Sequence, residues 1–294
     1  MEFKEFEEYV KESIQRRYPE ALITVNEVIK NNGFKRTGIA IMHKEEIVSP
    51  TIYLEGFYNR LLDNENIEVL IEEMIDTYER NRIHDTEFIR VMDFDFVKDK
   101  IAYKLINYSK NEEMLKDMPY RRWNNLAIVY YISLGVKEDL TGSCVVNNGL
   151  MKNWNTSEEE LYRLAKNNTP VKVLFKSMAD IVRDMKDRDD LDITDEMLDD
   201  TGMYVLSNIT KVNGASVILY DGVLQTISGF LEADLIIIPS SVHEVIIMRY
   251  DSLEQAEYVN DMVRQVNGTL CTEDILSDNA YRYIREKNET VIIE

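Results

Sequence analysis

The sequence of 294 residues contains only two cysteines, Cys144 and Cys271. Two cysteines are too few for a disulfide scaffold or a four-cysteine metal site. Glycine is also scarce, with 11 residues, and neither of the phosphate-binding patterns G-x-x-x-x-G-K-[ST] and G-x-G-x-x-G occurs. These absences exclude nucleotide binding through a familiar glycine-rich loop, and we expect no cofactor.

Histidine is represented by three residues that lie far apart in the sequence, His43, His84 and His243. Glu244 follows the last of them, but no second histidine completes the H-E-x-x-H zinc spacing. The acidic stretch at 184–200 lacks the central glycine and terminal glutamate of a calcium loop. We therefore expect no metal site.

Basic side chains are outnumbered, with 34 Lys and Arg against 54 Asp and Glu, for a formal net charge of −20. This charge repels nucleic-acid phosphates and anionic lipid alike, and no lysine cluster offsets it. We expect no direct binding to nucleic acid. Two interpretations of the acidic composition remain open. The surface is simply solvated, or it mimics nucleic acid and blocks a nuclease or defence factor.

Long apolar runs are absent. No stretch approaches eighteen uninterrupted apolar residues, and the N-terminal segment MEFKEFEEYV has no apolar core of a signal peptide. We expect no membrane span, no contact with a membrane and no secretory signal, and hence a cytoplasmic protein.

The composition is otherwise that of a globular protein, with 45% hydrophobic and 10% aromatic residues. Strand-like runs alternate with helical patterns, which indicates an α+β fold of two mixed domains, each with antiparallel strands and packed helices. Residues 186–200 are rich in aspartate, and charge repulsion there favours a solvated connector. We expect one domain at 1–185, this connector, and a second domain at 201–294.

The first eighty residues predict a helix, a β-hairpin and a pair of helices. Apolar residues at steps of three and four predict a first helix that ends before Pro19. An Asn-Asn-Gly turn separates two strand patterns, and a break at Asp63-Asn64 separates two helical patterns. These elements are expected at residues 3–14, 21–29, 34–42 and 54–78.

Two later stretches share the order strand, turn, strand, capped helix. Their helices begin at Ser157 and Ser252, each followed three residues later by Glu or Gln in a capping-box spacing. The shared order indicates either an internal repeat or only an order of elements that is common in α+β proteins. Between the two stretches, the sequence predicts a strand at residues 214–220, with Asn213-Gly214 as a hairpin turn.

The segment Pro239-Ser240-Ser241-Val242-His243-Glu244 places polar residues between two apolar runs. A turn explains all of them, because the proline ends the first strand, the serines bond to local backbone and Val245 resumes the sheet. A second interpretation gives His243 a binding role. A third is a hydrolase centred on Ser241 and His243.

The hydrolase interpretation requires a base beside the serine and an acid that orients the base. On an extended strand, Ser241 and His243 would project to one face and Glu244 to the other, so the acid is poorly placed. No G-x-S-x-G elbow occurs. We therefore expect no catalytic residue.

Trp123 follows Arg121 and Arg122 in the segment RRWNN. Tryptophan and arginine are typical anchors of protein interfaces. Because the surrounding composition is acidic, a stacking platform for single-stranded nucleic acid is disfavoured. The segment predicts a protein interface, with core packing as the alternative.

These features together resemble an uncharacterised bacterial family, a domain of unknown function of about this length from gut anaerobes and their mobile elements. The segments that carry the resemblance include LINYSKNEEMLKDMPYRRWNNLAIVYYI, SEEELYRLAKNNTP and LIIIPSSVHEVIIM. The Pro-Ser-Ser-x-His-Glu element looks like the family's signature. The resemblance implies a shared α+β fold and no particular activity, and it directs attention to Pro239, Ser240, Ser241, His243 and Glu244 as binding positions.

We therefore expect a cytoplasmic binding or regulatory accessory protein without catalytic activity, whose partner is another protein. The alternatives are the acidic nucleic-acid mimic and the hydrolase centred on Ser241 and His243. The sequence predicts neither the oligomeric state nor the identity of the partner.

Overall fold

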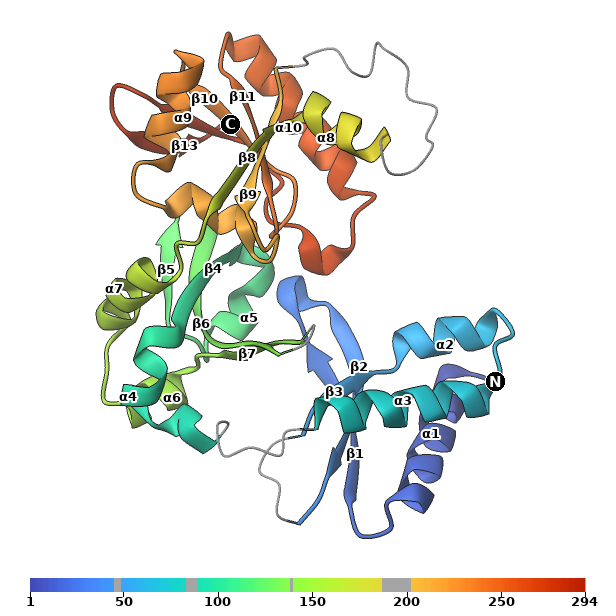
Figure 1. Ribbon diagram of the computed structural model, residues 1–294. Coiled ribbons are helices and arrows are strands. Elements are labelled where there is room, and N and C mark those ends of the chain that lie inside the picture. Colours follow the sequence, from blue (N-terminus) through green and yellow to red (C-terminus); the bar gives the residue numbers. More distant parts are fainter. Residues whose placement is uncertain (45–48, 83–88, 138–139, 187–201, 294) are drawn as a thin grey trace. The chain divides into compact units, whose positions relative to one another are not determined.

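The computed structural model describes residues 1–44, 49–82, 89–137, 140–186 and 202–293. The chain divides into two compact units. Unit 1 contains residues 1–97 with 135–141, and unit 2 contains residues 98–134 with 142–294. Both units mix helices with antiparallel strands (Figure 1), which confirms the predicted α+β class.

Unit 1 is built on a three-stranded sheet. Its elements are α1 (Phe3–Arg17), β1 (Leu22–Ile29), β2 (Lys35–Met42), β3 (Thr51–Tyr53), α2 (Glu55–Leu62), α3 (Ile67–Asn81) and α4 (Phe94–Val97). The strand order is β1-β2-β3, and Leu22 pairs with Met42 at one end of the first hairpin. The first helix, the β-hairpin and the two helices α2 and α3 confirm the prediction for the first eighty residues.

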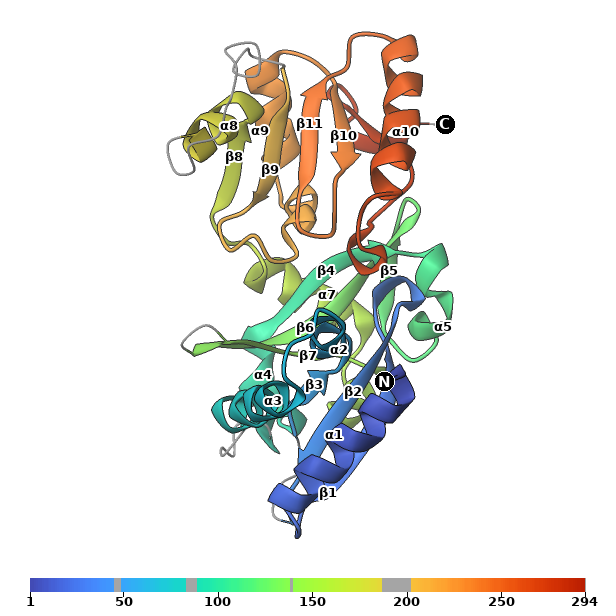
Figure 2. The ribbon, with the colours of Figure 1, turned by 90° about the vertical axis from the view of Figure 1, so that its right-hand side faces the viewer.

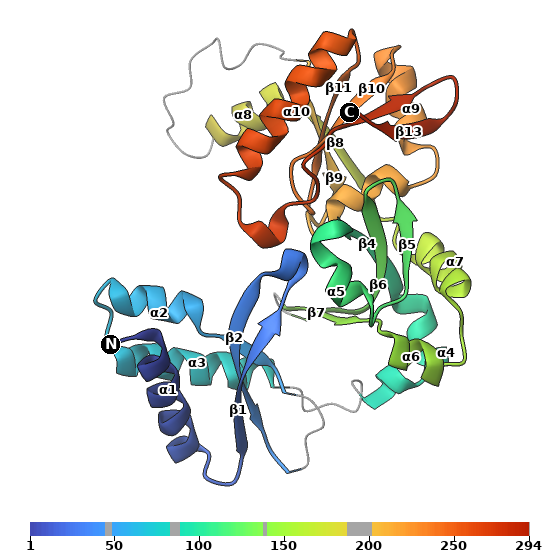
Figure 3. The ribbon, with the colours of Figure 1, turned by 180° about the vertical axis from the view of Figure 1, so that it is seen from behind.

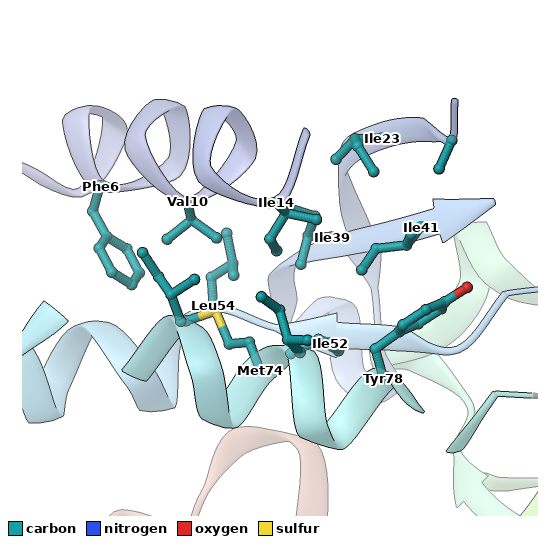
Figure 4. Packing of buried hydrophobic residues seen from close by; sticks show 13 residues of the cluster. Phe6, Val10, Ile14, Ile23, Ile39, Ile41, Ile52, Leu54, Met74 and Tyr78 are labelled. Atoms are coloured by element: carbon teal, nitrogen blue, oxygen red, sulfur yellow. The ribbon is translucent and has the colours of Figure 1, made fainter. Parts of the chain in front are cut away.

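The core of unit 1 lies between the sheet and helices α1 and α3. Phe6, Val10 and Ile14 of α1 are fully buried, as their spacing predicts. Figure 4 shows these side chains pointing toward Ile39 of β2 and Met74 of α3. Since each such side chain stabilises the fold by about 1.5–3 kcal/mol when buried, this apolar stripe explains why the helix stays on the sheet.

Unit 2 contains two sheets, except that residues 135–137 and 140–141 of the first sheet are assigned to unit 1. The first pairs β4 (Ile101–Asn107), β6 (Leu126–Lys137) and β5 (Tyr120–Trp123) in the order β4-β6-β5, with β7 (Leu140–Val145) also on β6. The second has the order β13-β12-β10-β11-β9-β8. Its strands are β8 (Val173–Ser177), β9 (Tyr204–Asn208), β10 (Leu235–Pro239), β11 (Val245–Arg249), β12 (Tyr281–Ile284) and β13 (Glu289–Ile292). Figure 2 shows four of them, β8, β9, β11 and β10, side by side.

The helices of unit 2 are α5 (Glu112–Leu115), α6 (Asn148–Asn153), α7 (Glu158–Asn168), α8 (Met178–Lys186), α9 (Val223–Leu231) and α10 (Leu253–Asn267). Two of them start where the sequence predicts. The Ser157 hydroxyl accepts the N–H of Glu160, and the Ser252 hydroxyl accepts the N–H of Gln255. These bonds satisfy amides that have no partner within the helix.

Helices cover both faces of the six-stranded sheet. Ile236 and Ile238 of β10 pack against α10 on one face, and α9 lies on the other side from α8 and α10 (Figures 1 and 3). Because side chains alternate along a strand, every residue of β10 is buried. This explains why its sequence is a continuous apolar run.

The structure divides the chain at different places from the division expected at 186–200. Strand β8 precedes that stretch and β9 follows it, yet the two pair with each other, with Val173 opposite Asn208 and Ser177 opposite Tyr204. The stretch therefore joins neighbouring strands of one sheet. Its residues 187–200 lie outside those that the structure describes. Charge repulsion in the sequence predicts solvation, but it does not distinguish a connector between domains from one within a sheet.

The predicted strand at residues 214–220 is wrong. Gly214–Leu219 forms a 3₁₀ helix, and Asn213 before it has a left-handed backbone with φ of 52° rather than a place in a hairpin turn. The segment is buried on nearly all sides. A short apolar run that is buried all round has no period to separate strand from helix. The two proposed repeat copies also differ, because α6 separates strand and capped helix in the first copy alone.

Candidate functional site

The segment from Pro239 to Glu244 is the turn between β10 and β11, which pair antiparallel. The amide of Ser241 donates to the carbonyl of Glu244 across 3.1 Å, and the Ser241 hydroxyl accepts the N–H of His243 at 3.0 Å. Pro239 is buried at the end of β10, while Ser240 and Glu244 are half-buried. The serine therefore bonds to local backbone, as the turn interpretation expects.

The imidazole of His243 is held by two groups that the sequence pattern does not reveal. The amide of Asn213 donates to Nδ1 at 3.3 Å, and Nε2 lies 3.6 Å from a carboxylate oxygen of Asp274. Since Nδ1 accepts a hydrogen bond, the hydrogen-bond network assigns the proton of the neutral ring to Nε2. Both ring nitrogens are directed at groups other than Ser241, so the turn provides no serine–histidine pair for proton transfer.

Asp274 and Asn213 reach His243 because of the tertiary fold. Asp274 ends the 3₁₀ turn Thr272–Asp274, and its carbonyl accepts the amide of Val242 at 2.9 Å. Asn213 lies thirty residues before His243, in the loop after β9. No local spacing links these residues, so sequence reasoning missed both.

Gly214 allows the turn to pack closely on this loop. A Cβ atom there would lie 2.0 Å from the Ser207 hydroxyl and 2.4 Å from the carbonyl oxygen of His243. Those two atoms already bond to each other, because the Ser207 hydroxyl donates to that carbonyl at 2.7 Å. A larger side chain at position 214 would push the turn away from β9.

The loop after β9 is fixed by its own side chains and carries exposed apolar groups. Asn208 Nδ2 donates to the carbonyl of Val212 at 2.8 Å, and Thr210 donates to Asn208 Oδ1 at 2.8 Å. Ile209 is 57% exposed and Val212 is 42% exposed. The loop therefore presents two apolar side chains on a constrained backbone, and its residue Asn213 bonds to His243.

The side chain of Arg121, on β5, bonds to residues of α7 within unit 2. Its guanidinium donates to both carboxylate oxygens of Glu158 and also pairs with Glu159. The guanidinium lies 4.0 Å from the centre of the Tyr162 ring, a cation–π contact. These contacts hold Arg121 against α7 of the same chain, and its predicted interface role stays a prediction.

Arg122 and Trp123 also have partners in unit 2. Arg122 lies over the ring of Tyr108 at 3.5 Å. Trp123 packs against Tyr281 of β12, with ring centres 5.3 Å apart, and so joins the two sheets. Within the described part of the chain, no hydrogen bond or ring contact connects these residues to the Pro239–Glu244 turn.

A buried tyrosine lies beside the Arg121–Glu158 pair. Tyr130 of β6 is fully buried, and its hydroxyl donates to the Glu158 carboxylate. Burial, and then the neighbouring carboxylate, raise the pKa of Tyr130 well above its usual range. A phenol held neutral in this way serves the packing of α7 on the sheet rather than proton transfer near neutral pH.

An open hollow of about 640 Å³ lies at the ends of β10 and β12. Asp234 accepts two bonds from the Arg282 guanidinium and one from the amide of Arg285. Burial works to raise the pKa of Asp234, but these bonds outweigh it and hold that pKa below its ordinary value. Asp234 and Arg282 therefore neutralise each other at the wall of this hollow.

The described residues contain no cluster of three His, Cys, Asp or Glu side chains suited to a metal ion. None of their helices combines the length and apolarity that a bilayer crossing requires.

The helices and antiparallel sheets define the chain as an α+β protein. A family model described as a family of unknown function (DUF5688) matches residues 3–285. The chain belongs to this family, and the match includes the first hundred residues as well as the later segments. No curated protein and no solved structure matches it.

Proposed function

We propose that the protein is a non-enzymatic binding protein, and that its partner, another protein, docks on the turn–loop surface, defined as residues 209–212 with His243. The observation that carries the proposal is the pairing of exposed apolar side chains, Ile209 and Val212, with a backbone fixed by hydrogen bonds. A constrained apolar surface loses little conformational entropy on binding.

The chemistry of the turn supports binding rather than catalysis. A serine hydrolase needs an imidazole nitrogen free to take the serine proton. Here Nδ1 of His243 accepts the amide of Asn213, and Nε2 faces Asp274. The histidine acts as a bridge that holds the β10–β11 turn against the neighbouring loop.

A pull-down from host lysate with matched variants tests the proposal. Val212→Asp places a charge on the turn–loop surface, and Tyr258→Asp places one on α10, where the side chain is also exposed. We expect a protein that co-purifies with the wild type and with Tyr258→Asp but is lost with Val212→Asp. The same recovery with all three would overturn the proposal, as would ester or amide hydrolysis that His243→Ala abolishes.

A second candidate, the acidic mimic, is favoured by one observation in unit 1. Glu68, Glu72 and Asp76 follow each other at four-residue steps on α3 and line an open hollow of about 400 Å³. A nuclease panel tests this candidate. Inhibition that is relieved by the double variant Glu72→Lys and Asp76→Lys supports it, and absence of inhibition excludes it for that panel.

A further inference from the structure

Strand β8 is the last strand in the order β13-β12-β10-β11-β9-β8, so β9 is its one neighbour in the described part of the sheet. The bonds just beyond the ends of this pair reveal which groups of β8 face outward. The amide of Ile209 donates to the carbonyl of Lys172, and the amide of Met178 donates to the carbonyl of Met203, each at 2.9 Å. Hydrogen-bonded pairs alternate in an antiparallel ladder, so the even-numbered residues of β8 bond to β9.

The odd-numbered residues Val173 and Phe175 therefore direct their N–H and C=O groups away from β9. No described residue bonds to these four groups. A row of unpaired backbone groups at a sheet edge is a template for another strand. Val173 and Phe175 together provide two N–H donors and two C=O acceptors for an extended chain.

An apolar surface borders this edge on one face of the sheet. Phe175 stacks on Tyr204 with ring centres 4.9 Å apart, and Phe230 of α9 meets Phe175 edge to face at 6.3 Å. Phe230 is 69% exposed, although large aromatic side chains are usually buried. An added strand would place alternate side chains against this aromatic group and would cover Phe230.

Positive charge borders the same edge on the opposite face. Lys176 points away from the Phe175 side, because successive side chains of a strand alternate, and it pairs with Asp184. Lys172 directly precedes the strand and, by the same alternation, lies on the same face as Lys176. Its side chain is exposed and forms no ion pair with any described residue. The opposite face of an added strand would therefore meet a lysine with no counter-charge.

We propose that the β8 edge binds an extended segment of a partner protein in which apolar and acidic residues alternate, so that the segment becomes a seventh strand of the sheet. Its apolar side chains would lie on Phe175 and Phe230, and its carboxylates near Lys172. A second copy of this chain is disfavoured as occupant, since each copy carries a formal charge of −20. The proposal rests on the proposed function only in that both require a protein partner.

A library of random nine-residue peptides, selected on the full-length protein, provides the first test. We expect enriched sequences in which apolar and acidic residues alternate. A labelled synthetic peptide of the enriched sequence is then titrated in a fluorescence-anisotropy assay. Val173→Pro removes an outward N–H without removing a bond to β9, so we expect Kd to rise at least about tenfold.

Two further measurements guard against misfolding of the proline variant. Phe230→Ala should also raise Kd about tenfold, whereas Tyr258→Ala, a similarly exposed aromatic on α10, should leave Kd unchanged. In the peptide, N-methylation at the amides that face β8 should abolish binding, and N-methylation at the intervening amides should not.

The proposal is overturned if no alternating sequence is enriched, or if Val173→Pro and peptide N-methylation both leave Kd unchanged. It is also overturned if sedimentation shows a dimer that Val173→Pro dissociates, because the occupant would then be a second copy. Val212→Asp separates this proposal from the proposed function. Loss of the lysate partner in that variant, with normal peptide binding, would support the turn–loop surface independently of the β8 edge.

Discussion

The amide of Asn213 donates to Nδ1 of His243 across 3.3 Å, which directs the opposite ring nitrogen toward Asp274. This bond ties the β10–β11 turn to the loop after β9. It also removes Nδ1 from any proton transfer that involves Ser241. The histidine of the turn therefore has a structural role that can be measured as stability.

His243→Ala should lower the free energy of unfolding by about 1 kcal/mol, because the Asn213 amide loses its acceptor. Urea denaturation measures the change. Lys211→Ala in the same loop is the control, because this exposed side chain forms no ion pair with a described residue, and its effect should stay within about 0.5 kcal/mol. Equal stability of His243→Ala and the wild type would contradict the bridging role.

Gly214→Ala should destabilise the protein by about 3 kcal/mol. Its Cβ would lie 2.4 Å from the carbonyl oxygen of His243 and 2.9 Å from the amide nitrogen of Asn208, and backbone atoms cannot move aside cheaply. Gly229→Ala in α9 is the matched control. Nothing lies within 4 Å of its Cβ, so it should stabilise the helix by about 1 kcal/mol. Thermal and urea unfolding measure the change in the free energy of unfolding, which should have opposite signs in the two variants. An unchanged free energy of unfolding in Gly214→Ala would refute the close packing.

Tyr103→Phe should raise the free energy of unfolding by about 1 kcal/mol at neutral pH. The Tyr103 hydroxyl is buried, and no described residue bonds to it, so its removal relieves a desolvation cost. Tyr130→Phe is the matched comparison in the same sheet. It should destabilise by a similar amount, because the bond to Glu158 is lost. Denaturant titration measures the free energy of unfolding of both variants. Destabilisation by Tyr103→Phe would contradict the prediction.

Stability should fall as the pH rises above about 10, the pKa of an unfolded tyrosine. Burial raises the pKa of Tyr103 and Tyr130 above that value, so both are neutral in the folded protein and ionise on unfolding. Their contribution is fully present below pH about 10 and is lost progressively above it. The double variant Tyr103→Phe, Tyr130→Phe should lose less stability between pH 8 and 11. Tyr258→Phe, at an exposed position, should follow the wild type; an equal fall in all three would contradict the assignment.

The sequence by itself determined the elements whose patterns have a clear period or a local chemical signal. The spacing of Phe6, Val10 and Ile14 requires a helix with one apolar face, and the structure buries that face. Ser157 and Ser252 mark helix starts, because their hydroxyls bond amides only three residues away. The Pro239–Glu244 turn belongs to the same class, since the two bonds of Ser241, to Glu244 and from His243, lie within the segment.

Only the tertiary structure decided which distant groups meet. The contacts of His243 with Asn213 and Asp274 span about thirty residues in each direction, and no spacing rule reaches that far. Residues 214–220 show the same limit, because a segment buried on nearly all sides carries no periodic signal. The pairing of β8 with β9 across the acidic stretch follows from the sheet, since local charge determines solvation but does not choose a strand's neighbour.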